Sequence, residues 1–549
     1  MIKKRNNALS KMKKINIYAI LILTLFPISI LSCNDDEVFV ETGEELLAID
    51  EDFGSAQRDN VFVLNPERWG IVEGNVSNEV AKENTQILNF IIKRVAEFGI
   101  TTLQIDEMDA FFEVNSRVNN PKIKSESAIL IPSNFELRMS DNVFMRVQPN
   151  GAHTYSLLMV FEGENIKING GNLIGDRWVH DYSPEVDLYG NEWVAHDWGH
   201  IIQISGGKNV EIDNVNISAA TGDGIVVHES VIRTDSNSVI SENVTIKNCT
   251  IDEIRRNALS FLDGDGILLE NCDITNTGQG PENPKGVYNS SGAYPKYGIS
   301  FEAYRGRDAN NNLIEYQRIE NVEIRNNRFT GNYGGDINLY TCSNVNIHDN
   351  YFDSMIANIA SHDITIKDNI MEARLDDDGN YYQFGILFKS KFDPLGKEMN
   401  YNYTITGNQI KNYVNAMVLG GENYTVYNNT LTDFKAGITF YKYLNGAQLY
   451  NNTLTSNIST SSGYASLVAN TTDVSVSNEN VAVTYRPLNI SGLQANIVEK
   501  LIFDNCTFNS TDNKVNSISG SENITVQNSQ LNTQINVFNS TNIQQINNN

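Results

Sequence analysis

Apolar and polar residues alternate through a short phrase that recurs along most of the chain. Copies of it read NVEIDNVNI, NVTIKNCTI, NVEIRNNRF, NVNIHDNYF and NYTVYNNTL, and each closes on an apolar residue. The closing residues are Ile217, Ile251, Ile274, Phe329, Phe352, Met371, Ile410, Leu431, Leu454, Phe508 and Leu531. Alternation is typical of a β-strand, and the Asn or Gly inside each phrase predicts a corner.

A second phrase lies between copies of the first. It reads DGIVVH, NALSFL, YGISFE, GDINLY, FGILFK, NAMVLG and AGITFY. Two strands and two corners, repeated about every two dozen residues, predict an all-β fold: a single-stranded, right-handed parallel β-helix. A leucine-rich repeat would need a leucine consensus that this chain lacks, and a β-propeller would need blades about twice as long.

The N-terminal part predicts a cap for the open end of the coil. Residues 80–99 have the spacing of an amphipathic helix, and a solenoid must cover its exposed end. We therefore expect the cap over residues 61–150, the β-helix with insertions over residues 151–540 and a C-terminal tail over residues 541–549. The Ser-, Thr- and Asn-rich stretch 456–489 reads as one insertion.

The chain begins with what resembles a lipoprotein signal peptide over residues 1–33. A basic start precedes the apolar run IYAILILTLFPISIL and then LSC, ending at Cys33, which would carry the lipid anchor. The acidic residues that follow resemble the surface-export signal of Bacteroidetes-type lipoproteins. Residues 34–60 would form a flexible acidic linker, leaving an outer-membrane lipoprotein exposed at the cell surface. The alternative is a cleaved secretion signal with a chance cysteine.

Charge and aromatic content narrow the class of ligand. The chain has 67 acidic and 41 basic residues, a net charge of −26, which argues against nucleic acid as a partner. Three of the four tryptophans, Trp178, Trp193 and Trp198, share one segment with His180 and His196. Flat rings beside carboxylates and imidazoles suit a pyranose site, and a buried loop plug is the alternative.

Three cysteines follow an asparagine at equal positions of the first phrase. Cys249, Cys272 and Cys506 are therefore expected to be buried and stacked, and the first two would form a disulfide only if they lie on neighbouring turns. Their spacing predicts no metal site.

Aligned copies of the second phrase predict one functional face. Side chains alternate across a strand, so the residues that follow the inward columns point outward. These outward residues are His228, Leu262, Glu302, Tyr340, Lys389, Gly420 and Tyr441. Asp223 stands between Gly222 and Gly224 at the corner that leads into this face, and Arg255 and Arg256 occupy the equivalent corner of the next turn. A solvated face with corner aspartates is the alternative.

Several motifs between about Asn65 and Tyr304 resemble one superfamily. NPERWGI, ILIPSNFELRM, GGNLIGDR, HDWGH, TGDGI, RRNALSF and YGISFE look like the pectate-lyase-like β-helix superfamily, and more narrowly its polysaccharide-processing, phage-tailspike-like branch. That superfamily includes hydrolases, lyases, epimerases and binding proteins. The NTD, DD and GHG series of polygalacturonases and the arginine-proline signature of pectate lyases are absent. In that branch the segment that corresponds to HDWGH usually reads EWG, whereas this chain has Asp197-Trp198-Gly199.

Hydrolysis of a polysaccharide is the reaction that these motifs favour. It needs a carboxylic acid and a second carboxylate, for which Asp223 and Glu302 are the best pair. Asp197 is the alternative carboxylate. His200 or His228 would orient the pair or shift its pKa values. The residues expected to line sugar subsites or to hold a uronate or sulfate group are Trp193, Trp198, Tyr304, Arg255 and Arg256.

Two other functions stay open. A lyase would use His228, Tyr340 or Lys389 as the base, with an arginine to neutralise the uronate. A surface lipoprotein that binds glycan without chemistry would still need the tryptophans. No cofactor is required; calcium is common among lyases of the wider superfamily, but DGDG at Asp263 and LDDDG at Leu375 lack EF-hand spacing and read as turns. The sequence leaves the polymer and the oligomeric state open.

Overall fold

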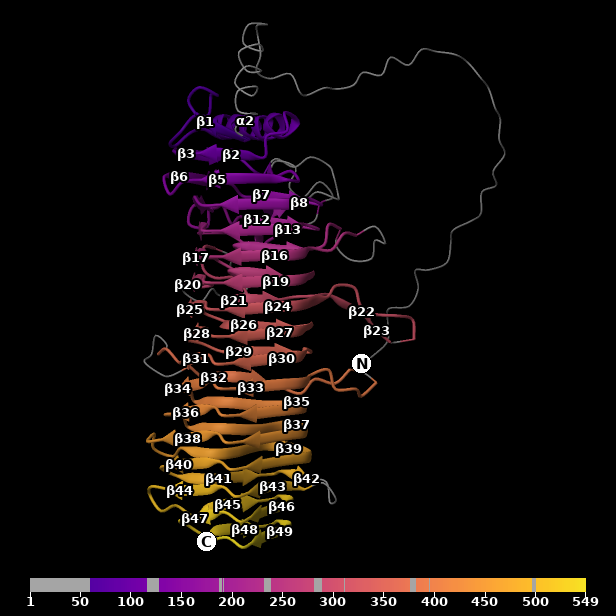
Figure 1. Cartoon of the computed structure of the whole chain (residues 1–549), viewed down its shortest axis with the longest axis vertical. Helices are drawn as coiled ribbons and strands as arrows, with labels where there is room; N and C mark the ends of the chain where they lie inside the picture. Colours follow the sequence, from indigo (N-terminus) through magenta and orange to yellow (C-terminus); the bar gives the residue numbers. More distant parts are fainter. Residues whose placement is uncertain are drawn as a thin grey trace, which may run out of the picture. The chain divides into compact units, whose positions relative to one another are not determined.

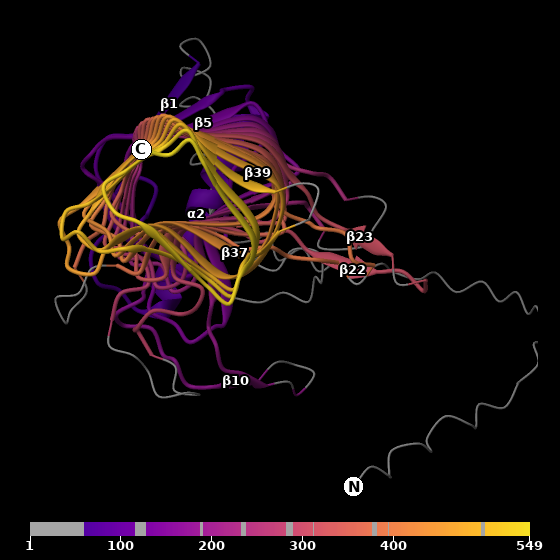
Figure 2. The same ribbon diagram turned by 90° about the horizontal axis from the view of Figure 1, so that it is seen from below.

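The strands stack into one parallel coil whose turns have three sides (Figures 1 and 2). The computed structural model describes residues 60–115, 128–186, 190, 192–231, 238–280, 289–310, 312–375, 382–393, 395–495 and 500–549. Cys33, the predicted signal peptide and almost all of the predicted linker lie outside these residues. Among the described residues, no helix is long and apolar enough to span a membrane.

We call the three sides of each turn the first, second and third side, in chain order. The first side comprises β4 (Ile129–Leu130), β7 (Thr154–Phe161), β12 (Trp198–Ser205), β15 (Ile225–His228), β18 (Leu259–Phe261), β21 (Tyr297–Phe301), β26 (Gly335–Tyr340), β29 (Ile356–Ile359), β32 (Phe384–Phe388), β41 (Arg486–Ser491), β45 (Asn516–Ser519) and β48 (Ile535–Phe538). Three long strands bend from the first side into the second: β35 (Asn415–Tyr427), β37 (Ala436–Tyr450) and β39 (Ser462–Ser477).

The remaining strands of the coil form the other two sides. The second side comprises β1 (Val61–Leu64), β2 (Thr102–Ile105), β5 (Phe135–Met139), β8 (Glu164–Asn169), β13 (Lys208–Asp213), β16 (Glu242–Lys247), β19 (Gly264–Glu270), β24 (Ile319–Arg325), β27 (Cys342–His348), β30 (His362–Lys367), β33 (Tyr401–Thr406), β42 (Gln494–Ala495), β43 (Leu501–Asp504), β46 (Glu522–Gln527) and β49 (Thr541–Ile546). The third comprises β3 (Met108–Phe112), β6 (Val143–Val147), β9 (Asn172–Ile174), β14 (Asn216–Ser218), β17 (Thr250–Asp252), β20 (Asp273–Thr275), β25 (Arg328–Thr330), β28 (Tyr351–Phe352), β31 (Ile370–Glu372), β34 (Gln409–Lys411), β36 (Thr430–Thr432), β38 (Thr453–Ser456), β40 (Asn480–Val483), β44 (Thr507–Ser510) and β47 (Gln530–Leu531). Two hairpins stand outside the coil: β10 (Glu185–Val186) with β11 (Glu192–Trp193), and β22 (Arg305–Arg307) with β23 (Leu313–Glu315).

The capping helix is α2 (Asn78–Glu97), which packs on β3. Ser77 caps its first turn, and the helix buries Leu88, Ile91 and Val95. The coil itself begins earlier than the predicted residue 151, because β1, β2, β5 and β8 already pair in register.

The C-terminal half is also more regular than expected. The stretch 456–489 contains β39 and β40, which pair with the turns on either side, so it is not an insertion. The expected tail contains β49, which pairs with β46 in the last turn.

The corner between the second and third sides explains the asparagine in the repeated phrase. It takes two residues, and the first has a left-handed backbone: φ is 55° at Asn248, Asn326 and Asn428. Asn tolerates this conformation better than other residues with a Cβ atom. The second residue of the corner points into the coil and is buried.

These buried second residues form a hydrogen-bonded ladder along the axis. The side-chain amide of each donates to the side-chain oxygen of the next, at 2.8–3.0 Å. Its members are Asn327, Asn350, Asn369, Asn408, Asn429, Asn452 and Glu479. Cys249, Cys272 and Cys506 occupy the same corner position; these buried thiols are free, so the disulfide considered for the first two does not form.

Replacing one rung should destabilise the coil far more than replacing its exposed neighbour. In Asn408→Ala, buried groups that Asn408 bonds, among them the carbonyl of Ile366, lose their partners. We expect the free energy of unfolding in urea to fall by about 2–4 kcal/mol. Gln409→Ala, one residue away on the surface, should change it by less than about 0.5 kcal/mol. Equal effects would contradict a structural role for the ladder.

Candidate functional site

The first side is bordered on both edges by long connections. Before its strands run residues 175–197, 276–296 and 373–383; after them run residues 229–241, 302–318 and 389–400. Parts of these connections lie outside the described residues. Figure 2 shows that the connections with β10 and with β22–β23 leave the coil at different corners. The outer surface of the first side is therefore the floor between two rows of loops.

Three charged side chains from three successive turns meet on this floor. The guanidinium of Arg256 donates through Nη1 to both oxygens of Asp223, at 3.1 and 2.9 Å. Through Nη2 it donates to both oxygens of Glu302, at 3.1 and 2.8 Å. One cation thus bridges two carboxylates, and each carboxylate is held by charge-assisted hydrogen bonds from one terminal nitrogen.

Two residues of the same motif complete the cluster, and the sequence analysis missed both. The backbone N–H of Asn257 donates to Asp223 Oδ1 at 3.0 Å. Its side-chain amide donates to Ser260 Oγ at 3.0 Å and to Glu302 Oε1 at 3.3 Å. Both lie in the motif RRNALSF, where Asn257 directly follows the arginines and Ser260 comes three residues later. That motif was the signal in the sequence that could have identified them. Ser260 shares an outward column with Ser300 of the next turn.

His200 lies beside the acid and Asp197 lies within electrostatic reach of the cation. The backbone N–H of Asp223 donates to His200 Nδ1 at 3.2 Å, so the imidazole accepts a hydrogen bond from the backbone of the acid. Burial opposes the charge on Arg256, but the carboxylates of Asp223 and Glu302 raise its pKa. Asp197 raises it further, to a smaller extent.

The surroundings of Asp223 raise its pKa and so favour its protonated form more than water does. Asp223 is 1% exposed, and burial raises its pKa to about 7. Arg256 opposes the shift and the negative charge of Glu302 adds to it. A buried acid with a raised pKa next to a second carboxyl group is a characteristic acid–base arrangement.

The neighbouring Arg255 has a different role from the one predicted for it. It is 1% exposed, and its three nitrogens donate to backbone carbonyls of the loops at this edge. The acceptors are the carbonyls of Asn289, Ser291, His196, Thr221 and Ala195. It therefore holds the loops onto the coil, and its burial keeps the guanidinium away from a uronate or sulfate group on the surface.

Of the outward residues predicted to share one face with Glu302, His228 is buried and Lys389 lies two turns from Tyr340. His228 is 4% exposed: Nδ1 donates to the carbonyl of Glu229, and Nε2 lies 3.0 Å from both Gln203 Nε2 and Ser205 Oγ. Strand β29, absent from the predicted set, lies between the turns of Tyr340 and Lys389, so these two are two turns apart.

Of the predicted aromatic residues, some are exposed at the surface and others pack against neighbouring side chains. Trp193 is 44% exposed and stacks on His153 with ring centroids 4.4 Å apart. Trp198 meets His200 edge to face at 5.6 Å, so it packs against the cluster. Tyr304 stacks on Tyr316 at 5.4 Å beside Glu302.

The histidines His180 and His196 belong to a buried support. Asp176 accepts hydrogen bonds from Tyr155, Thr221, Asn150 and His180, and His180 Nε2 lies 2.9 Å from His196 Nδ1. Burial lowers the pKa of His196. This part of the segment matches the plug alternative, and it fixes the residues that precede Asp197.

Comparison with known proteins agrees with the coil. Residues 200–391 match the family model described as a right-handed beta helix region. Uncharacterized protein YclG of Bacillus subtilis (strain 168) is 30% identical over 388 residues, 69% of this chain and 60% of YclG. SPbeta prophage-derived uncharacterized protein YorA of the same organism is 29% identical over 375 residues, 67% of this chain and 58% of YorA. This chain is a right-handed parallel β-helix protein.

The match to these relatives is partial in length. The β-helix chain spans about 60% of each of them. Among solved structures, the N-terminal fragment of gene product 12 of bacteriophage Phi29 aligns over 92% of this chain and 73% of that fragment, with 14% identity and a TM-score of 0.48.

No metal cluster occurs on the described part of this β-helix. Within the described ranges, no three His, Cys, Asp or Glu side chains are grouped as ligands. Asp263, in the first of the two Asp-Gly turns, accepts from the backbone N–H of Arg318 at 3.1 Å, and burial raises its pKa to about 7. Most of the second turn lies outside the described residues.

Arg255→Met should show that this arginine is structural. The substitution strips five carbonyl contacts, so we expect the free energy of unfolding to fall by about 3 kcal/mol or more and limited proteolysis within residues 175–197 to accelerate. The matched control is Arg325→Met, which breaks surface ion pairs with Glu270 and Glu323 and should cost under about 1 kcal/mol. If both variants unfold alike in urea, Arg255 does not hold the loops.

Proposed function

We propose that this β-helix protein is a glycoside hydrolase that cleaves a polysaccharide on its first side, with Asp223 as the general acid and Glu302 as the base or nucleophile. The observation that carries the proposal is the shared guanidinium of Arg256, which holds a carboxyl group with a pKa of about 7 beside a second carboxylate. The loops on both edges give a polymer a floor to lie on.

The proposed reaction uses Asp223 as the proton donor and Glu302 as the nucleophile or base. Asp223 donates its proton to the glycosidic oxygen as the bond to the anomeric carbon breaks. In one alternative Glu302 attacks that carbon, and water later releases the sugar while Asp223 takes back a proton from that water. In the other, Glu302 removes a proton from the water that attacks. Arg256 fixes the orientation of both carboxyl groups, and Asn257 supports them by hydrogen bonds.

Hydrolysis is favoured over β-elimination because the predicted cations are already engaged. Elimination needs a positive charge to neutralise the uronate carboxylate. Arg255 is bound to backbone carbonyls, and both terminal nitrogens of Arg256 are bound to Asp223 and Glu302. For the same reason, these arginines do not support the expectation of an acidic or sulfated substrate.

A surface location would suit such an enzyme, because a large polymer must be cut before it can cross an outer membrane. We propose that Cys33, predicted to carry a lipid, anchors the protein at that surface. Exposed Trp193 and Tyr304 would stack on sugar rings near the carboxyl pair.

Conservative amides at the two carboxyl groups should abolish turnover without unfolding the coil. We expect Asp223→Asn and Glu302→Gln each to lower kcat by at least about 10³-fold on the polysaccharide that the parent protein cuts. Glu323→Gln, on the second side, should retain full activity and is the matched control. The assay follows reducing ends and ultraviolet absorbance together over neutral, uronate-containing and sulfated polymers.

Each pattern of signals has a defined meaning in that assay. Reducing ends alone support hydrolysis, whereas reducing ends with absorbance indicate elimination. Near-normal rates in both amide variants, or silence of the parent protein across the panel, would reject the assignment.

The pH dependence should carry the signature of Asp223. The general acid must carry its proton to act, so activity should be lost as Asp223 ionises. We expect kcat/KM to fall about tenfold per pH unit above about pH 7, and this fall is the alkaline limb of the profile. Arg256 lowers this pKa, so residual activity in Arg256→Met should have its limb at higher pH. If the alkaline limb of Arg256→Met lies at the same pH as that of the parent protein, a group other than Asp223 produces it.

The same group gives a check that needs no substrate. Its folded-state pKa is raised, so Asp223 costs stability as pH rises from about 4 to about 7. Over that interval the parent protein should lose a few kcal/mol of unfolding free energy relative to Asp223→Asn.

A further inference from the structure

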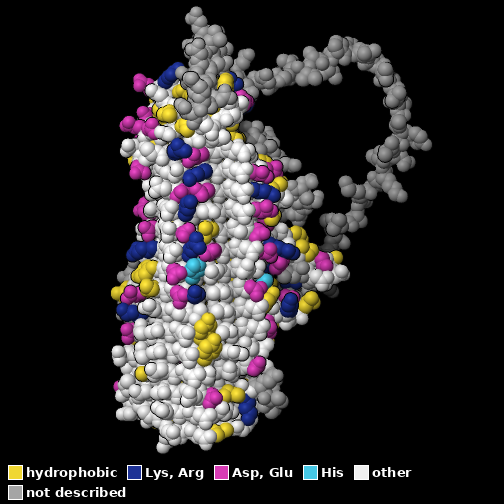
Figure 3. Space-filling model, in the orientation of Figure 1, with side chains coloured by type: hydrophobic (Ala, Val, Ile, Leu, Met, Phe, Trp, Pro, Cys, Tyr) yellow, Lys and Arg dark blue, Asp and Glu magenta, His cyan; other side chains and the backbone are white. Residues whose placement is uncertain are grey.

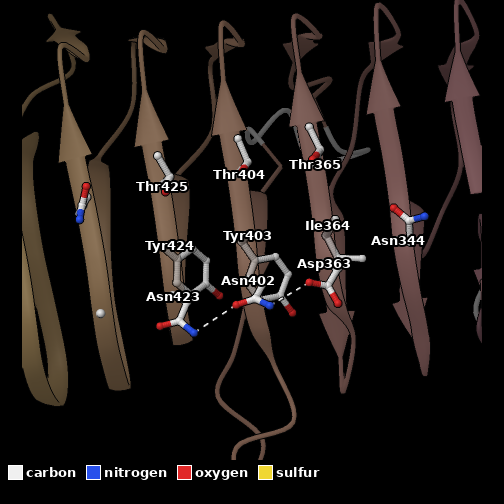
Figure 4. Close-up of a pocket in the computed structure, with 12 residues that line it drawn as sticks. Asn344, Asp363, Ile364, Thr365, Asn402, Tyr403, Thr404, Asn423, Tyr424 and Thr425 are labelled. Atoms are coloured by element: carbon white, nitrogen blue, oxygen red, sulfur yellow. Dashed lines mark hydrogen bonds between the residues drawn. The ribbon is translucent and has the colours of Figure 1, made fainter. Parts of the chain in front are cut away.

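The second side carries a shallow pocket that the proposed active site does not use. It has a volume of about 550 Å³ and lies over β27, β30, β33, β35 and β37 (Figure 4). Its outer lining consists of Asn344, Asp363, Asn402, Asn423, Thr365, Thr404, Thr425, Gly446 and Gln448. The other lining residues, Ile364, Tyr403 and Tyr424, are buried in the coil. Ligand pockets commonly measure about 300–1,000 Å³.

Two polar rows cross the pocket parallel to the axis of the coil. Thr365, Thr404 and Thr425 lie in register on neighbouring strands and point outward (Figure 4). Beside them, the amide of Asn423 donates to Asn402 at 3.1 Å, and that of Asn402 donates to Asp363 at 2.8 Å. Neighbouring strands are about 4.8 Å apart, close to the length of one pyranose unit in an extended chain.

Stacked aromatic rings lie at both ends of the strands that carry the pocket, one or two residues beyond its lining residues. His362 and Tyr401 stack with centroids 4.5 Å apart and an interplanar angle of 4°. At the other end, Tyr427 and Tyr450 stack at 5.0 Å and 10°. Aromatic rings next to hydroxyl and amide groups, which both donate and accept, match the apolar faces and hydroxyl groups of sugars.

The pocket is almost uncharged, unlike the same side nearer the N-terminus. There, Glu211 on β13 forms ion pairs with Lys167 and Lys247. Figure 3 shows charged side chains gathered over the upper turns of the face in view and sparse over the lower turns. In the pocket the single ionisable side chain at the surface is Asp363, whose oxygens are bound by His362 and Asn402.

We propose that this pocket is a second, non-catalytic carbohydrate site that binds a neutral polysaccharide chain laid along the axis of the coil. Threonine hydroxyl groups and asparagine amides bond its sugar hydroxyls, and the bordering rings contact its apolar faces. The lone carboxylate at Asp363 leaves no acid–base pair for cleavage. The site lies on a different side of the coil from Asp223 and Glu302, and it does not depend on the proposed hydrolysis.

The experiment places one bulky charge in the pocket and an identical one outside it. Thr404→Arg projects a guanidinium into the middle of the threonine row. Thr245→Arg on β16 is the matched control, because Thr245 lies in the same outward column, several turns away. Both are made in Glu302→Gln protein, so that cleavage at the first side does not consume the probe. Urea unfolding of each variant verifies that the coil is intact.

Affinity gel electrophoresis is run with hydroxyethyl cellulose, dextran and galactomannan, and with alginate and polygalacturonate as charged probes. We expect at least one neutral polymer to retard the protein, Thr404→Arg to weaken that retardation at least tenfold, and Thr245→Arg to leave it unchanged. The site is refuted if no neutral polymer retards the protein, if only charged polymers do, or if both arginine variants behave alike. A change in mass in solution for Thr404→Arg alone would instead make this face a contact between two copies of the chain.

Discussion

The structure depends on in-register stacking of parallel turns. Each strand satisfies its backbone groups through the turns above and below it, so every side chain meets its own equivalents along the axis. A buried polar side chain must then be satisfied by a copy of itself. An amide can do this because it both donates and accepts, and the ladder of asparagines is the result. At Glu479 the ladder ends on an acceptor, whose other oxygen binds the hydroxyl of Tyr464 at 2.8 Å.

The same stacking assembles the candidate site from residues far apart in sequence. Asp223, Arg256 and Glu302 come from three successive turns, and each faces outward on the same side. One guanidinium between two carboxylates leaves an excess negative charge in a largely desolvated place. Burial disfavours the charged form of Asp223 and, together with the negative charge of Glu302, outweighs the opposing effect of Arg256, so the pKa of Asp223 is raised.

Alternation made the coil and its inward columns predictable, and it failed where a residue lies in a corner or departs from the pattern. Strand β29 reads IANI, and its Ala357 and Asn358 hid the turn that separates Tyr340 from Lys389. In the corner before β18, sequence alone does not tell which of two adjacent arginines faces outward. Contacts with distant loops decide it: Arg255 turns in toward residues 195, 196, 289 and 291, and Arg256 faces the floor.

The position of the working face follows from the ladder. Each rung directly follows the left-handed residue of the two-residue corner between the second and third sides, as Asn350 follows Asp349. An insertion there would displace a rung and leave buried amides unpaired on both neighbouring turns. Among the described residues, the other two corners carry no buried ladder. The asparagine pairs beside one of them, such as Asn423 with Asn402, are exposed, so these corners can lengthen without leaving buried amides unpaired. Both border the first side, so long loops collect along its two edges. The first side lies opposite the corner that carries the ladder. It is therefore flanked by loops on both edges, and Asp223 and Glu302 lie between them.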